Sequence, residues 1–126
     1  MKKIIILFFA FCLAIGANAQ FANTSWKGQF NMPDPTQMIL QFKTDTLSLN
    51  SPDNTPFETM SYKISNDTLT IHKLYGQSEC SYDKDATYKI MIKDKKLFAT
   101  PLSDDCSQRV AVWPSDGLEK IESPNL

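Results

Sequence analysis

The chain has 126 residues, of which 42% are hydrophobic and 21% are charged, and its formal net charge at pH 7 is −1. This length corresponds to one domain, and the hydrophobic share is sufficient for a core of modest depth. The nearly balanced charge, with no long basic run, argues against a nucleic-acid partner.

The first 19 residues have the pattern of an export signal. Two lysines precede an apolar run over 4–15, and residues 17–19 (ANA) form a small-x-small cleavage pattern. The apolar run is too short for a comfortable membrane span. We therefore expect a signal peptide over 1–19 and a periplasmic or secreted domain over 20–126 with no transmembrane segment. Removal of the two lysines leaves 13 − 2 = 11 basic residues against 14 acidic ones, a net charge of −3.

Period-two alternation predicts an all-β domain of eight strands. In chain order, the expected strands span 24–30, 37–43, 45–50, 58–65, 68–73, 85–93, 96–100 and 106–113. After residue 113, the sequence Pro-Ser-Asp-Gly breaks the pattern, and residues 118–122 could form a short C-terminal helical turn with Leu118 and Ile121 facing inward.

Three of the strand connections have the pattern of tight hairpins. Residues 62–72 (YKISNDTLTIH) alternate on both sides of Asn66-Asp67, a pair that favours a two-residue turn. Such turns pair inward-facing residues across each hairpin. The expected pairs are Ile64 with Leu69, Phe42 with Leu47, and Ile92 with Leu97.

The other connections, over 31–36, 51–57, 74–84 and 101–105, are long. In an antiparallel meander, alternate connections fall at alternate ends, so all long loops should lie together. Eight strands are enough to close an up-and-down barrel, which removes the edges of the sheet. The sequence therefore predicts an eight-stranded antiparallel up-and-down barrel with one end built from tight turns and one from long loops.

Cys80 and Cys106 remain after removal of the predicted signal, and both are expected at the long-loop end. An even pair in an exported protein predicts a disulfide bond. A zinc site made of these two cysteines and the distant His72 is disfavoured, and the adjacent Asp104 and Asp105 offer too few oxygens for calcium. No metal or other cofactor is expected.

An exported eight-stranded chain that opens with the sequence SWKG at 25–28 resembles the lipocalin-like (calycin-type) small β-barrels of secreted bacterial proteins. The resemblance covers residues 21 to about 113. Lipocalins open with Gly-x-Trp, whereas this chain has Thr24 in place of the glycine. The family's arginine that lies across this tryptophan corresponds to Arg109. The resemblance also implies a helical turn after the barrel.

The predicted inward face could either fill the barrel or leave room for one small apolar ligand. It comprises Trp26, Phe30, Met38, Leu40, Phe42, Leu49, Met60, Tyr62, Ile71, Tyr88 and Ile90. The segment 106–113 has two possible frames: Val110 and Val112 face inward, with Arg109 on the surface, or Arg109 faces inward. A buried guanidinium needs a partner, which could be the face of Trp26 or a ligand carboxylate.

No catalytic motif is present in the sequence: it has no Gly-x-Ser-x-Gly, no phosphate loop and no paired metal-ligand spacing. We expect a monomeric, non-enzymatic binding protein that takes a small apolar or amphipathic ligand at the long-loop end. The alternative is a filled barrel whose loops bind another exported protein, for example as a hydrolase inhibitor. The residues expected to contact the ligand are Phe30, Met38, Phe57, Met60, Tyr62, Tyr75, Tyr82, Tyr88 and Arg109.

Overall fold

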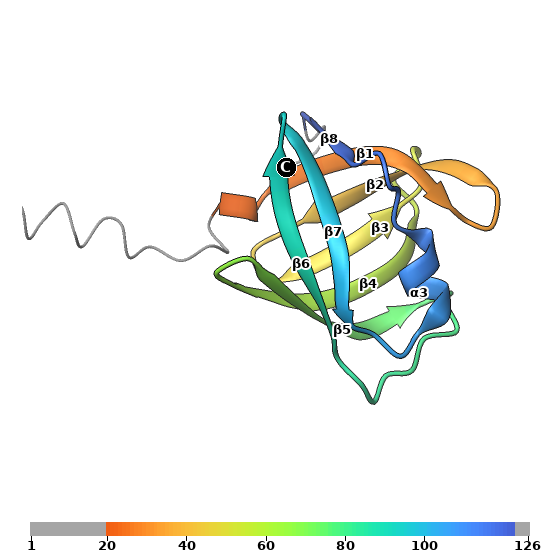
Figure 1. Cartoon of the computed structure of the whole chain (residues 1–126). Helices are drawn as coiled ribbons and strands as arrows, with labels where there is room; N and C mark the ends of the chain where they lie inside the picture. The colour runs from red at the N-terminus through yellow and green to blue at the C-terminus, as the bar shows by residue number, and fades with distance from the viewer. Residues whose placement is uncertain (1–19, 123–126) are drawn as a thin grey trace, which may run out of the picture.

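A computed structural model describes residues 20–122, so the predicted signal peptide lies outside the described part of the chain. Each strand is antiparallel to its neighbours in sequence, and β8 pairs with β1 to close a barrel (Figure 1). The predicted eight-stranded up-and-down barrel is confirmed. The elements are β1 (Thr24–Asn31), β2 (Pro35–Phe42), β3 (Thr46–Asn50), β4 (Pro56–Ser65), β5 (Thr68–Gly76), β6 (Ala86–Lys93), β7 (Lys96–Ser103), α3 (Ser107–Val112) and β8 (Leu118–Ile121).

The three hairpins have the registers that the alternation predicts. Ile64 pairs with Leu69, Phe42 with Leu47, and Ile92 with Leu97. The β6–β7 turn consists of Asp94 and Lys95, whose φ angles of 53° and 66° are both positive, as a type I′ turn requires. In the β4–β5 turn, Asn66 takes a φ of 57°, a conformation that asparagine adopts more readily than most residues.

The connections divide between the two ends of the barrel as predicted. The tight-turn end contains residues 43–45, 66–67 and 94–95. The long-loop end contains residues 32–34, 51–55, 77–85 and 104–113, and α3 lies within its last segment (Figure 1). Residues 114–117 then run back along the barrel beside Gly28 and Phe98, so that β8 pairs with the start of β7 near the tight-turn end. The β1–β2 connection is shorter than expected, because both strands extend into the predicted loop and pair as far as Asn31 and Pro35.

The C-terminal assignments are corrected by the structure. Residues 107–112 of the predicted strand 106–113 form helix α3, and Leu118–Ile121, predicted as part of a helical turn, is β8. The closing strand of the barrel is β8, which pairs with both β1 and β7. Leu118 is 1% exposed, and a Cβ on Gly28 of β1 would collide with it. The glycine therefore gives Leu118 the space to fill the closing seam.

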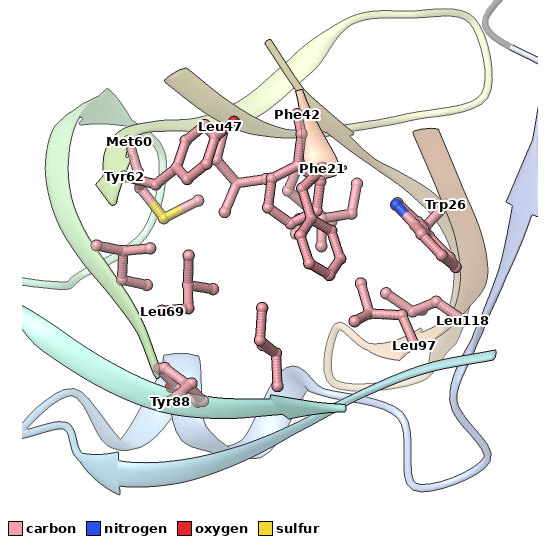
Figure 2. Close-up of a cluster of buried hydrophobic side chains, with 14 of the residues drawn as sticks. Phe21, Trp26, Phe42, Leu47, Met60, Tyr62, Leu69, Tyr88, Leu97 and Leu118 are labelled. Carbon is pink, nitrogen blue, oxygen red and sulfur yellow. The ribbon is translucent and has the colours of Figure 1, made fainter. Parts of the chain in front are cut away.

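Apolar side chains from all eight strands meet inside the barrel (Figure 2). Every residue of the predicted inward face is buried. The buried cluster comprises Phe21, Trp26, Phe30, Met38, Leu40, Phe42, Leu47, Leu49, Met60, Tyr62, Ile64, Leu69, Ile71, Ala86, Tyr88, Ile90, Leu97 and Leu118. Across residues 20–122, no helix has the length and apolar character that a membrane span requires.

Candidate binding site at the long-loop end

A cavity of about 530 Å³ lies at the long-loop end, between α3 and the mouth of the barrel. We call it the mouth cavity. Residues from both sides contribute a mainly apolar wall with a few polar groups. The lining residues are Asn31, Met32, Pro33, Leu49, Phe57, Glu58, Ser78, Gln108, Arg109, Ala111 and Val112.

Three links attach α3 to the loops around the mouth cavity. The predicted disulfide between Cys80 and Cys106 is confirmed, and it joins the β5–β6 loop to the residue before the helix. The backbone N–H of Glu79 donates to Oε1 of Gln108 at 2.8 Å. Nδ2 of Asn31 donates to the carbonyl oxygen of Ala111 at 3.2 Å. The disulfide therefore holds the start of the helix, and the β1 end holds its last turn.

The residue after α3 forms part of the contact between the helix and the core. The ring of Trp113 lies 6.1 Å from that of Phe30 and 5.3 Å from that of Tyr88, measured between centroids. Both distances fall in the range of favourable tilted aromatic pairs. The helix is therefore packed against the barrel through its C-terminal side, while the mouth cavity lies along Ala111 and Val112.

Arg109 and Asp104 form a buried, bidentate ion pair beside the mouth cavity. Nε of Arg109 donates to Oδ2 of Asp104 at 2.7 Å, and Nη2 donates to Oδ1 at 2.9 Å. The side chains are 10% and 0% exposed. The hydroxyl of Tyr88 also donates to Oδ2, and the backbone N–H of Cys106 donates to Oδ1 at 2.9 Å. Four donors thus satisfy one carboxylate.

These contacts shift the pKa values of all three side chains. Burial favours the neutral acid of Asp104, but hydrogen bonds from Arg109, Tyr88 and the Cys106 amide outweigh it and lower the pKa of Asp104. Burial also opposes the charged form of Arg109, yet the bonds and charge of Asp104 raise its pKa. The pKa of Tyr88 is raised, first by burial and then by its bond to the carboxylate. The pair is therefore ionised and the phenol is protonated at neutral pH.

One nitrogen of the Arg109 guanidinium takes no part in the ion pair with Asp104. Nη1 is buried and has no hydrogen-bond partner among the described residues. Arg109 lines the mouth cavity and also a smaller hollow of about 200 Å³ beside the disulfide. A buried guanidinium N–H without an acceptor is costly, so Nη1 is an unsatisfied donor of a residue that lines the cavity.

A second buried ion pair lies on the neighbouring wall. Nζ of Lys73 is 3.8 Å from Oε1 of Glu58, and the two side chains are 3% and 5% exposed. Nζ also donates to the carbonyl oxygens of Ser78 at 2.7 Å and Cys80 at 3.2 Å. Both Glu58 oxygens accept from Ser78, one from its hydroxyl and one from its backbone N–H. The pair thus fixes the β5–β6 loop to the barrel.

The structure brings two of the predicted contact residues, Phe57 and Arg109, to the mouth cavity. Five others belong to the buried core of the barrel: Phe30, Met38, Met60, Tyr62 and Tyr88. Tyr75 and Tyr82 point outward and are 60% and 52% exposed. The ring of Tyr82 lies 4.7 Å from Nζ of Lys73, a distance suited to a cation–π contact.

Neither predicted frame of segment 106–113 applies, because the segment is helical. Val110 is exposed, Val112 packs against the core, and Arg109 is buried against Asp104 instead of Trp26. The indole of Trp26 donates to the Thr24 hydroxyl at 3.0 Å.

Two polar residues around the site were not singled out from the sequence, Glu58 and Lys73, and a third, Asp104, was considered only as a calcium ligand. A signal existed for the first two, because period-two alternation places Glu58 in phase with Met60 and Lys73 in phase with Ile71. Two opposite charges on inward faces of adjacent strands predict a pair. The role of Asp104 depends on a helix that the sequence did not reveal.

Comparisons with models of known protein families, with curated proteins and with solved structures give no significant match.

Proposed function

We propose that the protein is an exported, non-enzymatic binding protein that holds a small apolar or amphipathic molecule in the mouth cavity. The observation that carries the proposal is the cavity itself. Its volume of about 530 Å³ lies within the range of roughly 300–1,000 Å³ found for small-molecule sites. The wall is mainly apolar, with a few polar groups to orient a ligand. Export is supported by the pattern of the first 19 residues and by the disulfide.

The interior of the barrel is filled by side chains, so the space for a ligand is at the mouth. Large side chains such as Phe42, Tyr62 and Tyr88 converge within the barrel, as Figure 2 shows for residues from opposite walls. A ligand would therefore lie above this core and beneath α3. The anchored helix and loops reduce the ordering that binding would otherwise require.

A neutral fluorescent probe, N-phenyl-1-naphthylamine, tests this proposal. Ala111 lines the mouth cavity and is exposed, so A111W should fill the cavity with little effect on folding. The matched control is V110W on the same helix, because Val110 is exposed and does not line the cavity. We expect the probe to bind the unmodified protein and V110W but not A111W. Failure of the probe to bind, or equal binding to both variants, would contradict the proposal.

A second candidate function is binding of another exported protein by the long loops. It is favoured by the exposure of two tyrosines, Tyr75 at 60% and Tyr82 at 52%. Tyrosine is enriched among residues that dominate protein interfaces. This candidate needs no cavity, so A111W would leave partner binding unchanged.

A further inference from the structure

We infer that the ligand of the mouth cavity is an uncharged amphiphile whose head group offers a carbonyl-type oxygen to Nη1 of Arg109. This inference rests on the proposed function and adds the chemical class of the ligand. Three observations lead to it: a donor of a cavity-lining residue lacks an acceptor, the charges around the cavity are already matched, and the rest of the wall is mainly apolar.

The unmatched donor is Nη1 of Arg109. Its two sister nitrogens are engaged by Asp104, at 2.7 and 2.9 Å, so the guanidinium is held in one orientation. The side chain is 10% exposed, and Nη1 has no partner in the described part of the chain. A donor that is fixed in place and removed from bulk water binds an acceptor without further ordering of the side chain.

The charge balance disfavours an anionic head group. Asp104 already neutralises Arg109, and Lys73 neutralises Glu58, which itself lines the cavity. An added carboxylate would be a third negative group beside two matched pairs, and it would lose its hydration without a free cation to replace it. A cationic head group is also disfavoured, because it would face Arg109 and could not accept its hydrogen bond. A neutral acceptor satisfies Nη1 and leaves both pairs intact.

The other polar groups of the two ion pairs offer no competing position. Nζ of Lys73 donates to three oxygens, the carbonyls of Ser78 and Cys80 and the Ser78 hydroxyl. The oxygens of Glu58 accept from Ser78. The apolar part of the ligand would contact Met32, Phe57 and Val112.

Three ligands with the same ten-carbon chain separate the possibilities: decanamide, decanoate and decylamine, titrated calorimetrically into the purified protein at pH 7.5. We expect decanamide to bind at least about tenfold more tightly than either charged analogue. Arg109 is the single arginine of the chain, so its guanidinium ¹⁵N resonances can be assigned without ambiguity. Decanamide should shift them in a saturable manner, with the same midpoint as the calorimetric titration.

The variant R109K keeps a positive charge beside Asp104 but lacks the planar fork. We expect it to lose the preference for decanamide over decanoate and decylamine. Should R109K fail to fold, the arginine resonances of the unmodified protein still decide the question. Tightest binding of decanoate, or binding of decanamide that leaves the Arg109 resonances unchanged, would overturn the inference and leave the proposed function standing. If neither the naphthylamine nor any of the three ligands binds, both are overturned.

Discussion

The guanidinium of Arg109 in helix α3 forms two hydrogen bonds with the carboxylate of Asp104, which lies five residues earlier in the loop before that helix. The pair spans the junction at which the chain leaves β7 and turns across the mouth of the barrel. Because Tyr88 of β6 donates to the same carboxylate, the junction is also tied to the barrel wall. This buried carboxylate therefore helps to fix the position of α3, together with the disulfide and the bond from Asn31 to Ala111.

Replacement of Asp104 by asparagine should strongly destabilise the protein. The substitution leaves Arg109 as a buried charge without its partner, and removal of one member of a buried pair costs on the order of 3 kcal/mol. Urea unfolding followed by tryptophan fluorescence measures the change. D105N is the control, because its partner Lys84 and Asp105 itself are both largely exposed. Equal midpoints for D104N and the unmodified protein would show that the pair is not structural.

The contribution of Asp104 should disappear in acid. Its pKa is lower in the folded protein than in the unfolded chain, where a value of about 3.9 is expected. The stabilisation is therefore present above pH of about 4 and is lost as the pH falls through the folded pKa. The free energies of unfolding of the unmodified protein and D104N should converge between pH 5 and the lowest pH at which both remain folded. A constant gap would contradict the assigned shift.

Loss of the disulfide should reduce both stability and binding. The bond closes a separation of 26 residues, and loop entropy predicts a loss of about 3.5 kcal/mol for the double variant C80S/C106S. Because Cys106 directly precedes α3, the variant should also bind N-phenyl-1-naphthylamine more weakly. Reduced, unmodified protein serves as a second sample and should behave in the same way. Unchanged probe binding in a folded variant would show that the helix is held in place by other contacts.

The Glu58–Lys73 pair should show coupling in a double-mutant cycle. K73M leaves the Glu58 carboxylate buried with fewer donors, and E58Q leaves a buried ammonium. We expect the losses of unfolding free energy in the two single variants to add up to more than the loss in the double variant E58Q/K73M. The difference, which is the interaction free energy, should be about 1–3 kcal/mol. The cycle is measured by urea unfolding. Additive effects would mean that Ser78 and the loop carbonyls, and not the opposite charge, satisfy each group.

Substitution of aromatic residues separates the two candidate functions. Phe57 lines the mouth cavity, whereas Tyr75 and Tyr82 project outward. For a small ligand, F57A should weaken binding by about 1–2 kcal/mol, and Y75A and Y82A should have little effect. For a protein partner, the tyrosine variants should cause the larger loss. Lysine-to-alanine changes at Lys93 and Lys95, in and beside the β6–β7 turn, are the control for both and should have no effect.

Most of the barrel could be read from the sequence because its strands alternate clearly and its turns are marked. Asn66-Asp67 and Asp94-Lys95 indicated the registers of two hairpins, and alternation placed the core correctly except at Ile92, which was expected to face inward and is 43% exposed. Segment 107–112 was mistaken for a strand because the β-branched residues Val110 and Val112 occupy alternate positions. A run of six residues cannot be distinguished from a short helix by period alone. The apolar residues of β8, Leu118 and Ile121, are spaced as on a helical turn, although pairing with β1 makes the segment a strand.

The site was harder to predict because it depends on contacts between distant segments. The long-loop end was located correctly from the connection lengths and from Cys80 and Cys106. Which loop residues face inward could not be derived, since loops have no period. The bond between Arg109 and Asp104 required knowledge that the intervening residues turn into a helix. Phe57 was identified as a large apolar residue at this end, by the same reasoning that selected the outward-facing Tyr75 and Tyr82.

The closing strand is also the shortest. β8 has four residues and meets β7 through only two paired positions, Lys96 with Glu119 and Leu97 with Leu118. Local opening is cheapest where few backbone bonds and few buried groups must be released. Fluctuations of the native state should therefore separate β8 from β7 before any other pair of strands. Amide protons of β8 should then exchange with solvent well before those of the β4–β5 hairpin. When β8 detaches, the edges of β1 and β7 lose their pairing partner and are exposed. Burial of the Leu118 side chain opposes this detachment and so keeps both edges covered.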